Sequence, residues 1–101
     1  MRPDFSVIIV NYFSYTVLKG CLKSLRQASA TLNVEVIVVN NGELQQNLAE
    51  LQVEFSEVIW LETGYNAGFA RANNLGIMHA KAPLVLLLNS DTLVPEGIME
   101  Y

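Results

Sequence analysis

The sequence predicts an α/β fold: an open, doubly wound, mainly parallel sheet with helices on both of its faces. Four short apolar runs rich in β-branched residues recur along the chain, and segments with helical periodicity separate them. Runs that are apolar at nearly every position are typical of strands covered on both faces, as in a parallel sheet. Strands that alternate with helices therefore predict an open parallel sheet between two helical layers.

Strands are expected over Phe5–Asn11, Val34–Asn40, Val58–Glu62 and Leu84–Asn89. Right-handed crossovers leave few arrangements of four such strands, and we expect the order 3-2-1-4. In that order the switch point lies between the carboxyl ends of the first and fourth strands, where ligands bind in open α/β sheets. The sequence therefore places a candidate site at this edge, where polar residues gather.

Helices are expected over Thr16–Ala28, Glu43–Val53 and Ala67–Ala80, because apolar residues recur there at helical spacing. Cys21 lies on the apolar stripe of the first helix, which favours a place in the core over a nucleophilic role. The inward face of the third helix is expected to hold Ala70, Asn74, Ile77 and Met78.

The composition fits a single domain over residues 1–101. The chain is 51% hydrophobic and only 16% charged, whereas a typical globular domain carries about 25% charged residues. It stops in a helix-like start, Glu96–Tyr101, so we expect a domain truncated at its C-terminus. Its thin surface charge predicts that the chain associates with itself through exposed apolar surface.

The charge and hydropathy of the chain limit which partners and which cellular compartment are expected. Six Lys and Arg residues and a net charge of −4 exclude a basic face for nucleic acid. No run approaches eighteen apolar residues, so no transmembrane segment is expected. The run that begins at Val7 is too short for a signal-peptide core. A cytoplasmic protein is therefore expected, at most peripheral at the inner face of a membrane.

Asn89-Ser90-Asp91 follows the fourth apolar run and is a candidate metal segment. The carboxylate of Asp91 would be a hard oxygen ligand for Mg²⁺ or Mn²⁺, and the cation would bridge diphosphate oxygens. The alternative is that Asp91 opens a turn or caps the following helix.

Asn40-Asn41-Gly42 follows the second strand and has two interpretations. Consecutive Asn then Gly suits a tight turn with positive φ. An Asn amide, which is both donor and acceptor, can instead pair with the edge of a nucleobase.

The segment from Gly64 to Gly76 combines Asn, Gly and Arg and runs into the third helix. Asn73 and Asn74 lie within the helical pattern although Asn is a poor helix former, which suggests a polar network or ligand contact. Gly68 near the helix start allows close approach of the backbone to a phosphate. The alternative is a structural loop-and-cap network.

Tyr12 and its aromatic neighbours suit either a stacking wall for a base or a loop packed on the core.

Four of these segments together resemble the nucleotide-binding half of an inverting family-2 glycosyltransferase with the GT-A fold, and within it the rhamnosyltransferase-like members. The segments are Ser6–Tyr12, Val36–Gly42, Asn66–Gly76 and Leu86–Thr92. The resemblance implies a nucleotide-diphosphate-sugar donor, with dTDP-L-rhamnose favoured and UDP-sugars next. It also implies a saccharide or lipid-linked saccharide acceptor and a divalent metal, Mg²⁺ or Mn²⁺.

The resemblance carries site residues over position by position. It places Asn11 and Tyr12 beneath the nucleotide, Asn40 and Asn41 at the base, and Asn89 and Asp91 at the Asp-x-Asp position, with Asp91 as the metal ligand. Asn66, Gly68, Asn73 and Asn74 match the motif that shapes the nucleotide pocket. Asn40 stands where the family usually has Asp, and Glu43 where it usually has Ser. The family's catalytic base comes from the second half of its fold, so it is expected beyond residue 101.

Two other functions remain open. A non-catalytic module of the same fold would bind a nucleotide or a partner protein without transferring a sugar. A receiver or flavodoxin-like domain shares the βα alternation, but a receiver needs an acidic cluster at the ends of its first and third strands. Asn11 and Thr63-Gly64 stand at those ends instead.

Overall fold

The computed structural model describes residues 3–12, 15–30, 32–42 and 48–90, and these fold as the predicted alternation of strands and helices. The elements in chain order are β1 (Phe5–Asn11), α1 (Tyr15–Ala28), β2 (Val34–Asn40), α2 (Leu48–Glu54), β3 (Ile59–Glu62), α3 (Phe69–His79) and β4 (Leu84–Asn89). Three strands have the predicted bounds, and β3 begins one residue later than expected. The expected start of the second helix at Glu43 lies outside the described residues.

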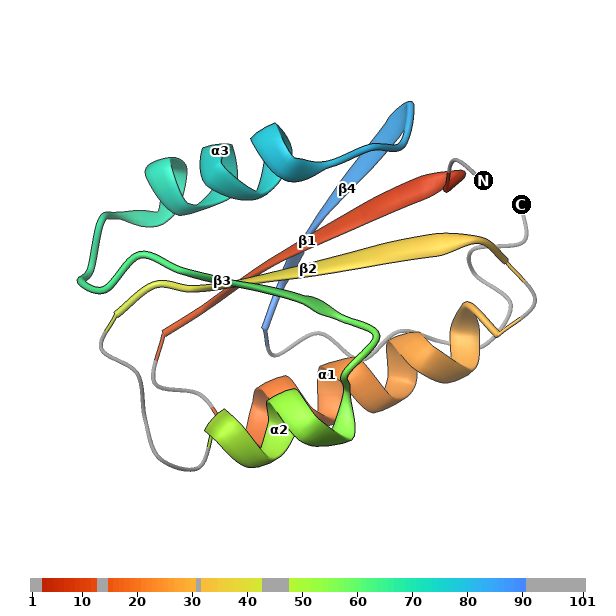
Figure 1. Cartoon of the computed structure of the whole chain (residues 1–101), viewed down its shortest axis with the longest axis horizontal. Helices are drawn as coiled ribbons and strands as arrows, with labels where there is room; N and C mark the ends of the chain where they lie inside the picture. Colours follow the sequence, from red (N-terminus) through yellow and green to blue (C-terminus); the bar gives the residue numbers. More distant parts are fainter. Residues whose placement is uncertain (1–2, 13–14, 31, 43–47, 91–101) are drawn as a thin grey trace.

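The sheet is parallel and has the expected order β3-β2-β1-β4. Helices α1 and α2 cover one face and α3 covers the other (Figure 1). We call these the α1–α2 face and the α3 face. The predicted α/β class, strand order and two helical layers are thus confirmed.

The core has two parts because successive side chains of a strand point to opposite faces. Val7 and Ile9 of β1 pack with α1 and α2 in the larger cluster, which also holds the buried Cys21. Ile8 and Val10 pack against Ala72 of α3 in the smaller cluster. Strand β1 is therefore buried on both faces, as its unbroken apolar run predicts.

Helix α3 presents a different face to the sheet from the one expected. Its buried residues are Ala72, Asn73 and Gly76, whereas Met78 is 81% exposed and Ile77 is 41% exposed. A Cβ atom on Gly76 would lie 2.5 Å from Cγ2 of Ile8, so the helix approaches the sheet along its smallest residues. The expected inward face, Ala70, Asn74, Ile77 and Met78, was therefore wrong.

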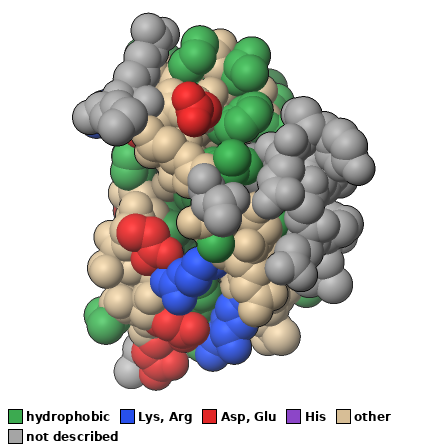
Figure 2. Space-filling model, turned by 90° about the vertical axis from the view of Figure 1, so that its right-hand side faces the viewer, with side chains coloured by type: hydrophobic (Ala, Val, Ile, Leu, Met, Phe, Trp, Pro, Cys, Tyr) green, Lys and Arg blue, Asp and Glu red, His purple; other side chains and the backbone are tan. Residues whose placement is uncertain are grey.

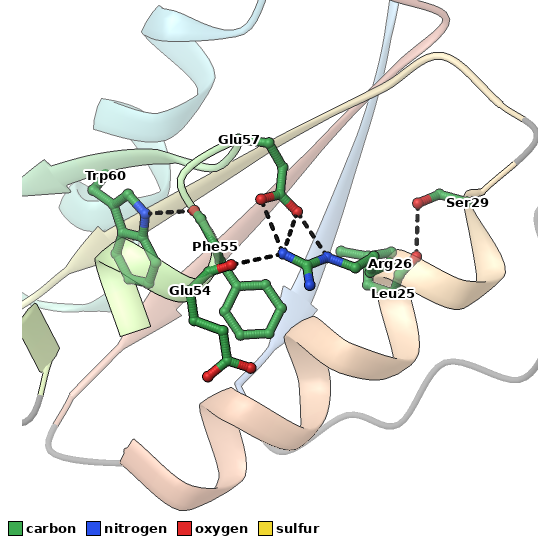
Figure 3. Close-up of polar contacts among 7 residues, drawn as sticks. All are labelled: Leu25, Arg26, Ser29, Glu54, Phe55, Glu57 and Trp60. Atoms are coloured by element: carbon green, nitrogen blue, oxygen red, sulfur yellow. Dashed lines mark hydrogen bonds and ion pairs between the residues drawn. The ribbon is translucent and has the colours of Figure 1, made fainter. Parts of the chain in front are cut away.

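Arg26 ties α1 to the segment between α2 and β3 (Figure 3). Its guanidinium donates to both carboxylate oxygens of Glu57, at 2.9 and 3.0 Å, and to the backbone oxygen of Glu54 at 2.9 Å. The same group lies 4.2 Å from the centroid of the Phe55 ring. Three hydrogen bonds and one ring contact thus converge on one planar cation, which links the two helices of this face.

The surface at the amino ends of the strands has mixed charge. Figure 2 views this end, where basic and acidic side chains lie next to each other. Ion pairs join Arg26 to Glu57 at 2.8 Å and Lys19 to Glu54 at 3.6 Å. Within the described ranges, no helix is long and apolar enough to cross a membrane.

Strand β4 is one of the two edge strands of the described sheet. Leu84, Val85, Leu86 and Leu87 are 41–57% exposed, although the two middle residues pair with Ser6 and Val7 of β1. Helix α3 contacts β1 and β2 most extensively, so β4 gains little cover from it. The expectation that this run is covered on both faces was therefore wrong. An apolar edge strand of this kind invites pairing with another chain.

Candidate nucleotide site

A hollow of about 750 Å³ lies at the carboxyl ends of β1 and β4, between the beginnings of α1 and α3. This is the switch point of the sheet, where the sequence placed the candidate site. Its lining residues are Val10, Tyr12, Val17, Asn41, Asn66, Gly68, Phe69, Asn89 and Ser90. None of these side chains carries a charge, so the described part of the hollow offers amides, hydroxyls, aromatic rings and aliphatic groups.

Asn41 is held from both ends of its side-chain amide. Its Oδ1 accepts a hydrogen bond from the backbone N–H of Ala67 at 2.8 Å, and its Nδ2 donates to Oδ1 of Asn66 at 3.2 Å. The residue is only 4% exposed. Because β2 alternates, Asn41 continues the row of Ile37 and Val39 and faces the α3 side of the sheet.

Asn66 continues the same chain of hydrogen bonds toward the start of α3. Its Oδ1 also accepts from the backbone N–H of Gly68 at 3.1 Å. Gly68 has φ 89°, and a Cβ there would meet nothing within 4 Å, so conformation rather than space requires glycine. Thr63 further stabilises the loop before α3, because its hydroxyl donates to the backbone oxygen of Tyr65 at 2.6 Å.

Asn11 and Asn40 lie on the opposite side of the sheet end, in a second polar row. Asn11, Asn40 and Glu62 stand in direct register at the carboxyl ends of β1, β2 and β3. Asn11 Nδ2 donates to Asn40 Oδ1 at 3.1 Å, and Asn40 Nδ2 donates to Glu62 Oε1 at 3.1 Å. Both Asn side chains are 3% exposed, and none of the three residues lines the hollow.

Two aromatic side chains flank the hollow with half of their surface open. Tyr12 is 51% exposed and Phe69 is 58% exposed. The sequence singled out Tyr12 but not Phe69. The signal for Phe69 was its place directly after Gly68, at the first residue of α3. Tyr15 packs partly against the core, and Phe13 lies outside the described residues.

Of the other residues that the sequence singled out, some line the hollow and others do not. Asn73 is buried under α3 and Asn74 is exposed on it, and neither lines the hollow. Asn89 lines it together with Ser90, whereas Asp91 lies outside the described residues. Tyr12, Asn41, Asn66, Gly68 and Asn89 are thus brought together in one place.

The polar side chains at the end of β4 offer oxygen atoms as possible ligands for a metal ion. Asn89 and Ser90 offer an amide oxygen and a hydroxyl, which are hard ligands of the kind that Mg²⁺ and Mn²⁺ prefer. Across the described ranges, no group of three or more His, Cys, Asp or Glu side chains is close enough to hold a metal ion by itself. The described residues therefore supply at most part of the coordination shell of a cation.

Comparison with known proteins gives consistent matches over nearly the whole chain. The family model described as "Glycosyl transferase family 2" matches residues 6–100. EpsH of Bacillus subtilis (strain 168), named as a candidate glycosyltransferase, is 28% identical over 100 residues, which are 97% of this chain and 29% of EpsH. The chain therefore spans less than a third of this curated relative.

Two solved structures share the fold. S. aureus TarS 1–349 in complex with UDP has a TM-score of 0.78 and 23% identity, over 96% of this chain and 30% of that one. The mannosyltransferase PcManGT from Pyrobaculum calidifontis, in complex with GDP-Man and Mn²⁺, has a TM-score of 0.79 and 20% identity. That match covers 94% of this chain and 29% of PcManGT.

Proposed function

The chain belongs to glycosyl transferase family 2, and from this premise we propose that it forms the donor-binding part of a sugar-transferring enzyme. The donor is a nucleotide-diphosphate sugar and the acceptor is a hydroxyl group of a saccharide or lipid-linked saccharide. The hollow at the carboxyl ends of β1 and β4 is the observation that carries this proposal. Its position at the switch point of the sheet is where open α/β folds bind nucleotides.

In this proposal the base and the diphosphate of the nucleotide contact different residues of the hollow. Tyr12 and Phe69 offer open aromatic faces on which a base can stack. Asn41 and Asn66 offer polar contacts beside them. Asn89 and Ser90 lie at the end of β4 and, with Asp91, would hold the divalent cation that neutralises the diphosphate. The complex of PcManGT with GDP-Man and Mn²⁺ supports a metal of this kind.

The donor we propose to test first is dTDP-L-rhamnose, because the sequence motifs resemble the rhamnosyltransferase-like branch. UDP-sugars are the nearest competitors, since thymine and uracil present the same pairing edge. TarS is known in complex with UDP and PcManGT with GDP-Man, so relatives of this fold accept different bases.

Transfer with inversion would need a carboxylate that removes a proton from the acceptor hydroxyl. That hydroxyl would then attack the anomeric carbon from the side opposite the diphosphate leaving group. The resemblance places this carboxylate beyond residue 101, and the relatives are more than three times longer than this chain. We therefore propose that residues 1–101 bind donor and do not catalyse transfer by themselves.

A non-catalytic nucleotide-binding module is the second candidate. The neutral, hydrogen-bonded side chain of Asn40 favours it. The side chain at that position carries no charge and is already bonded to Asn11 and Glu62. A double variant, Asn89→Ala with Asp91→Ala, separates the two candidates. Loss of metal-dependent nucleotide binding supports the enzyme, and unchanged binding supports the module.

The proposal is tested by titrating dTDP, UDP and GDP into the purified chain with and without Mn²⁺ and following thermal unfolding. A ligand at about one hundred times its Kd adds roughly 2.7 kcal/mol of stability. Stabilisation by dTDP or UDP that requires Mn²⁺ supports a pyrimidine-diphosphate site. No stabilisation by any of the three contradicts donor binding by this chain.

A further inference from the structure

We infer that Asn41-Gly42 is a deamidation site that the folded chain keeps closed, and that opening of the loop before α3 makes it reactive. Such a covalent modification is independent of nucleotide binding. Two features of the molecule carry it: the glycine that follows Asn41, and the hydrogen bonds that hold the Asn41 amide in the folded chain.

Deamidation of an asparagine starts when the backbone nitrogen of the next residue attacks the side-chain carbonyl carbon, Cγ. A bond forms between that nitrogen and Cγ, the bond from Cγ to Nδ2 breaks, and Nδ2 leaves as ammonia with the proton of the attacking N–H. Water then opens the cyclic succinimide to give aspartate or isoaspartate. A following glycine favours the attack, because a residue without Cβ leaves its nitrogen unhindered and its backbone free to turn.

Asn41 is the one asparagine in the sequence that precedes a glycine. Asn74 is the useful contrast, because it is followed by the branched side chain of Leu75 and lies exposed on α3. In the unfolded chain, where only the local sequence matters, we therefore expect Asn41 to react before Asn74.

In the folded chain the Asn41 amide is bonded at both ends to the loop before α3. Its Oδ1 accepts from the backbone N–H of Ala67 at 2.8 Å and from the hydroxyl of Thr63 at 3.3 Å. Its Nδ2, the nitrogen that would leave, donates to Oδ1 of Asn66 at 3.2 Å. These partners lie 22 to 26 residues away along the chain, so the side chain is anchored to a distant segment.

The backbone around Asn41 is held as well. Its N–H donates to the backbone oxygen of Asn11 at 2.7 Å, one residue beyond the paired ends of β1 and β2. Asn41 is 4% exposed and Gly42 is buried. A turn of the amide toward the nitrogen of Gly42 breaks its contacts with the loop, so reaction proceeds from a locally opened state.

Conversion would change the end of β2 in two ways. In aspartate, a second carboxylate oxygen would replace the nitrogen that now donates to Asn66, so two acceptors would face each other. In isoaspartate, the main chain would be longer by one carbon atom. Because Asn41 lines the hollow, either product would bring a negative charge into a described lining that has none.

Peptide mapping by mass spectrometry measures the reaction in the full chain. Samples are kept at mildly alkaline pH, folded in buffer or unfolded in guanidinium chloride, and the amide-to-acid mass change is followed at Asn41 and Asn74. In denaturant, Asn41 should convert before Asn74, and Gly42→Ala should slow its conversion. In buffer, conversion at Asn41 should be about tenfold slower or more than in denaturant.

Asn66→Ala tests whether the loop provides the protection. It removes the acceptor of Asn41 Nδ2, so the folded chain should convert about threefold to tenfold faster. Thr63→Val removes a donor to Oδ1 and repeats the test without changing Asn66. Arg26→Lys weakens a distant contact between α1 and Glu57; this matched control should leave the rate at Asn41 unchanged.

Equal rates at Asn41 in the folded and unfolded chain would overturn the inference. Faster conversion in the folded chain would also overturn it, because the donors to Oδ1 would then activate the amide instead of holding it. Unchanged rates in both loop variants would show that the loop gives no protection. If Arg26→Lys accelerated conversion as much as Asn66→Ala, global unfolding and not the loop would control the reaction, and the inference would again be wrong.

Discussion

The side-chain amide of Asn40 donates a hydrogen bond to the carboxylate of Glu62 across 3.1 Å, from the end of β2 to the end of β3. The same amide accepts from Asn11 on its other side. Only a group that is both donor and acceptor can serve these two neighbours at once. The amide at this position therefore suits its partner Glu62, whereas a carboxylate, the usual residue of the family's motif here, would face another carboxylate.

We expect Asn40→Asp to destabilise the fold by about 1–2 kcal/mol, because two carboxylates would meet where a hydrogen bond now lies. Urea unfolding measures the loss. The double variant Asn40→Asp with Glu62→Gln restores a donor opposite the new carboxylate and should recover most of the stability. Additive effects of the two changes would contradict the pairing.

Gly76→Ala should destabilise the chain by about 1–3 kcal/mol, although alanine is the better helix former. The added methyl would lie 2.5 Å from Cγ2 of Ile8 and 3.3 Å from Cγ2 of Val39, both in buried residues. Met78→Ala is the matched test of the helix face, because Met78 is 81% exposed. It should change the unfolding free energy by less than about 0.5 kcal/mol. If Met78→Ala strongly lowered the unfolding free energy and Gly76→Ala did not, α3 would have to pack against the sheet on its other face.

Arg26→Lys should cost about 0.5–1 kcal/mol even though it keeps the charge. Lysine cannot donate to both oxygens of Glu57 in the parallel geometry of a guanidinium, nor lie flat over Phe55. Since the Arg26 side chain is 47% exposed, part of the loss should vanish in high salt. Lys23→Ala, an exposed change on the same helix, is the control in the unfolding experiments. Equal losses for the two variants would show that the pairing with Glu57 adds nothing.

Asn89→Ala with Asp91→Ala should remove the Mn²⁺-dependent part of nucleotide binding and leave the metal-free part unchanged. The physical reason is the loss of hard oxygen ligands beside the diphosphate. Titrations of UDP with and without Mn²⁺ separate the two parts. Retention of the full metal effect would favour the non-catalytic module.

The 101-residue chain should associate with itself through β4, because this apolar strand lies at an edge of the described sheet. Leu84→Lys, at a residue that is 57% exposed, should reduce the association seen by sedimentation at high concentration. Val53→Lys, at a residue of α2 that is 80% exposed, should not. A monomer at all concentrations before substitution would disprove the prediction.

The sequence by itself determined the elements and their order. Runs that are apolar at nearly every position are typical of strands buried on both faces, as β1 is, and β1 and β2 begin and end where those runs do. β4 is also such a run, yet it is largely exposed. The right-handed crossover rule then left the observed strand order. The asparagines at the carboxyl ends could be placed at one edge of the sheet because parallel strands end there. Asn41 and Asn89 line the hollow at that edge, whereas Asn11 and Asn40 do not.

Only the tertiary structure decided which of these residues act together. Asn40 and Asn41 are neighbours in sequence, but the alternation of β2 sends one to Asn11 and Glu62 and the other to Asn66. Partners 22 to 29 residues apart are chosen by the register of the strands and by the loop that leads into α3. The exposed face of α3 followed from the close approach of Gly76 to Ile8, a contact between distant segments that local hydrophobic periodicity does not encode.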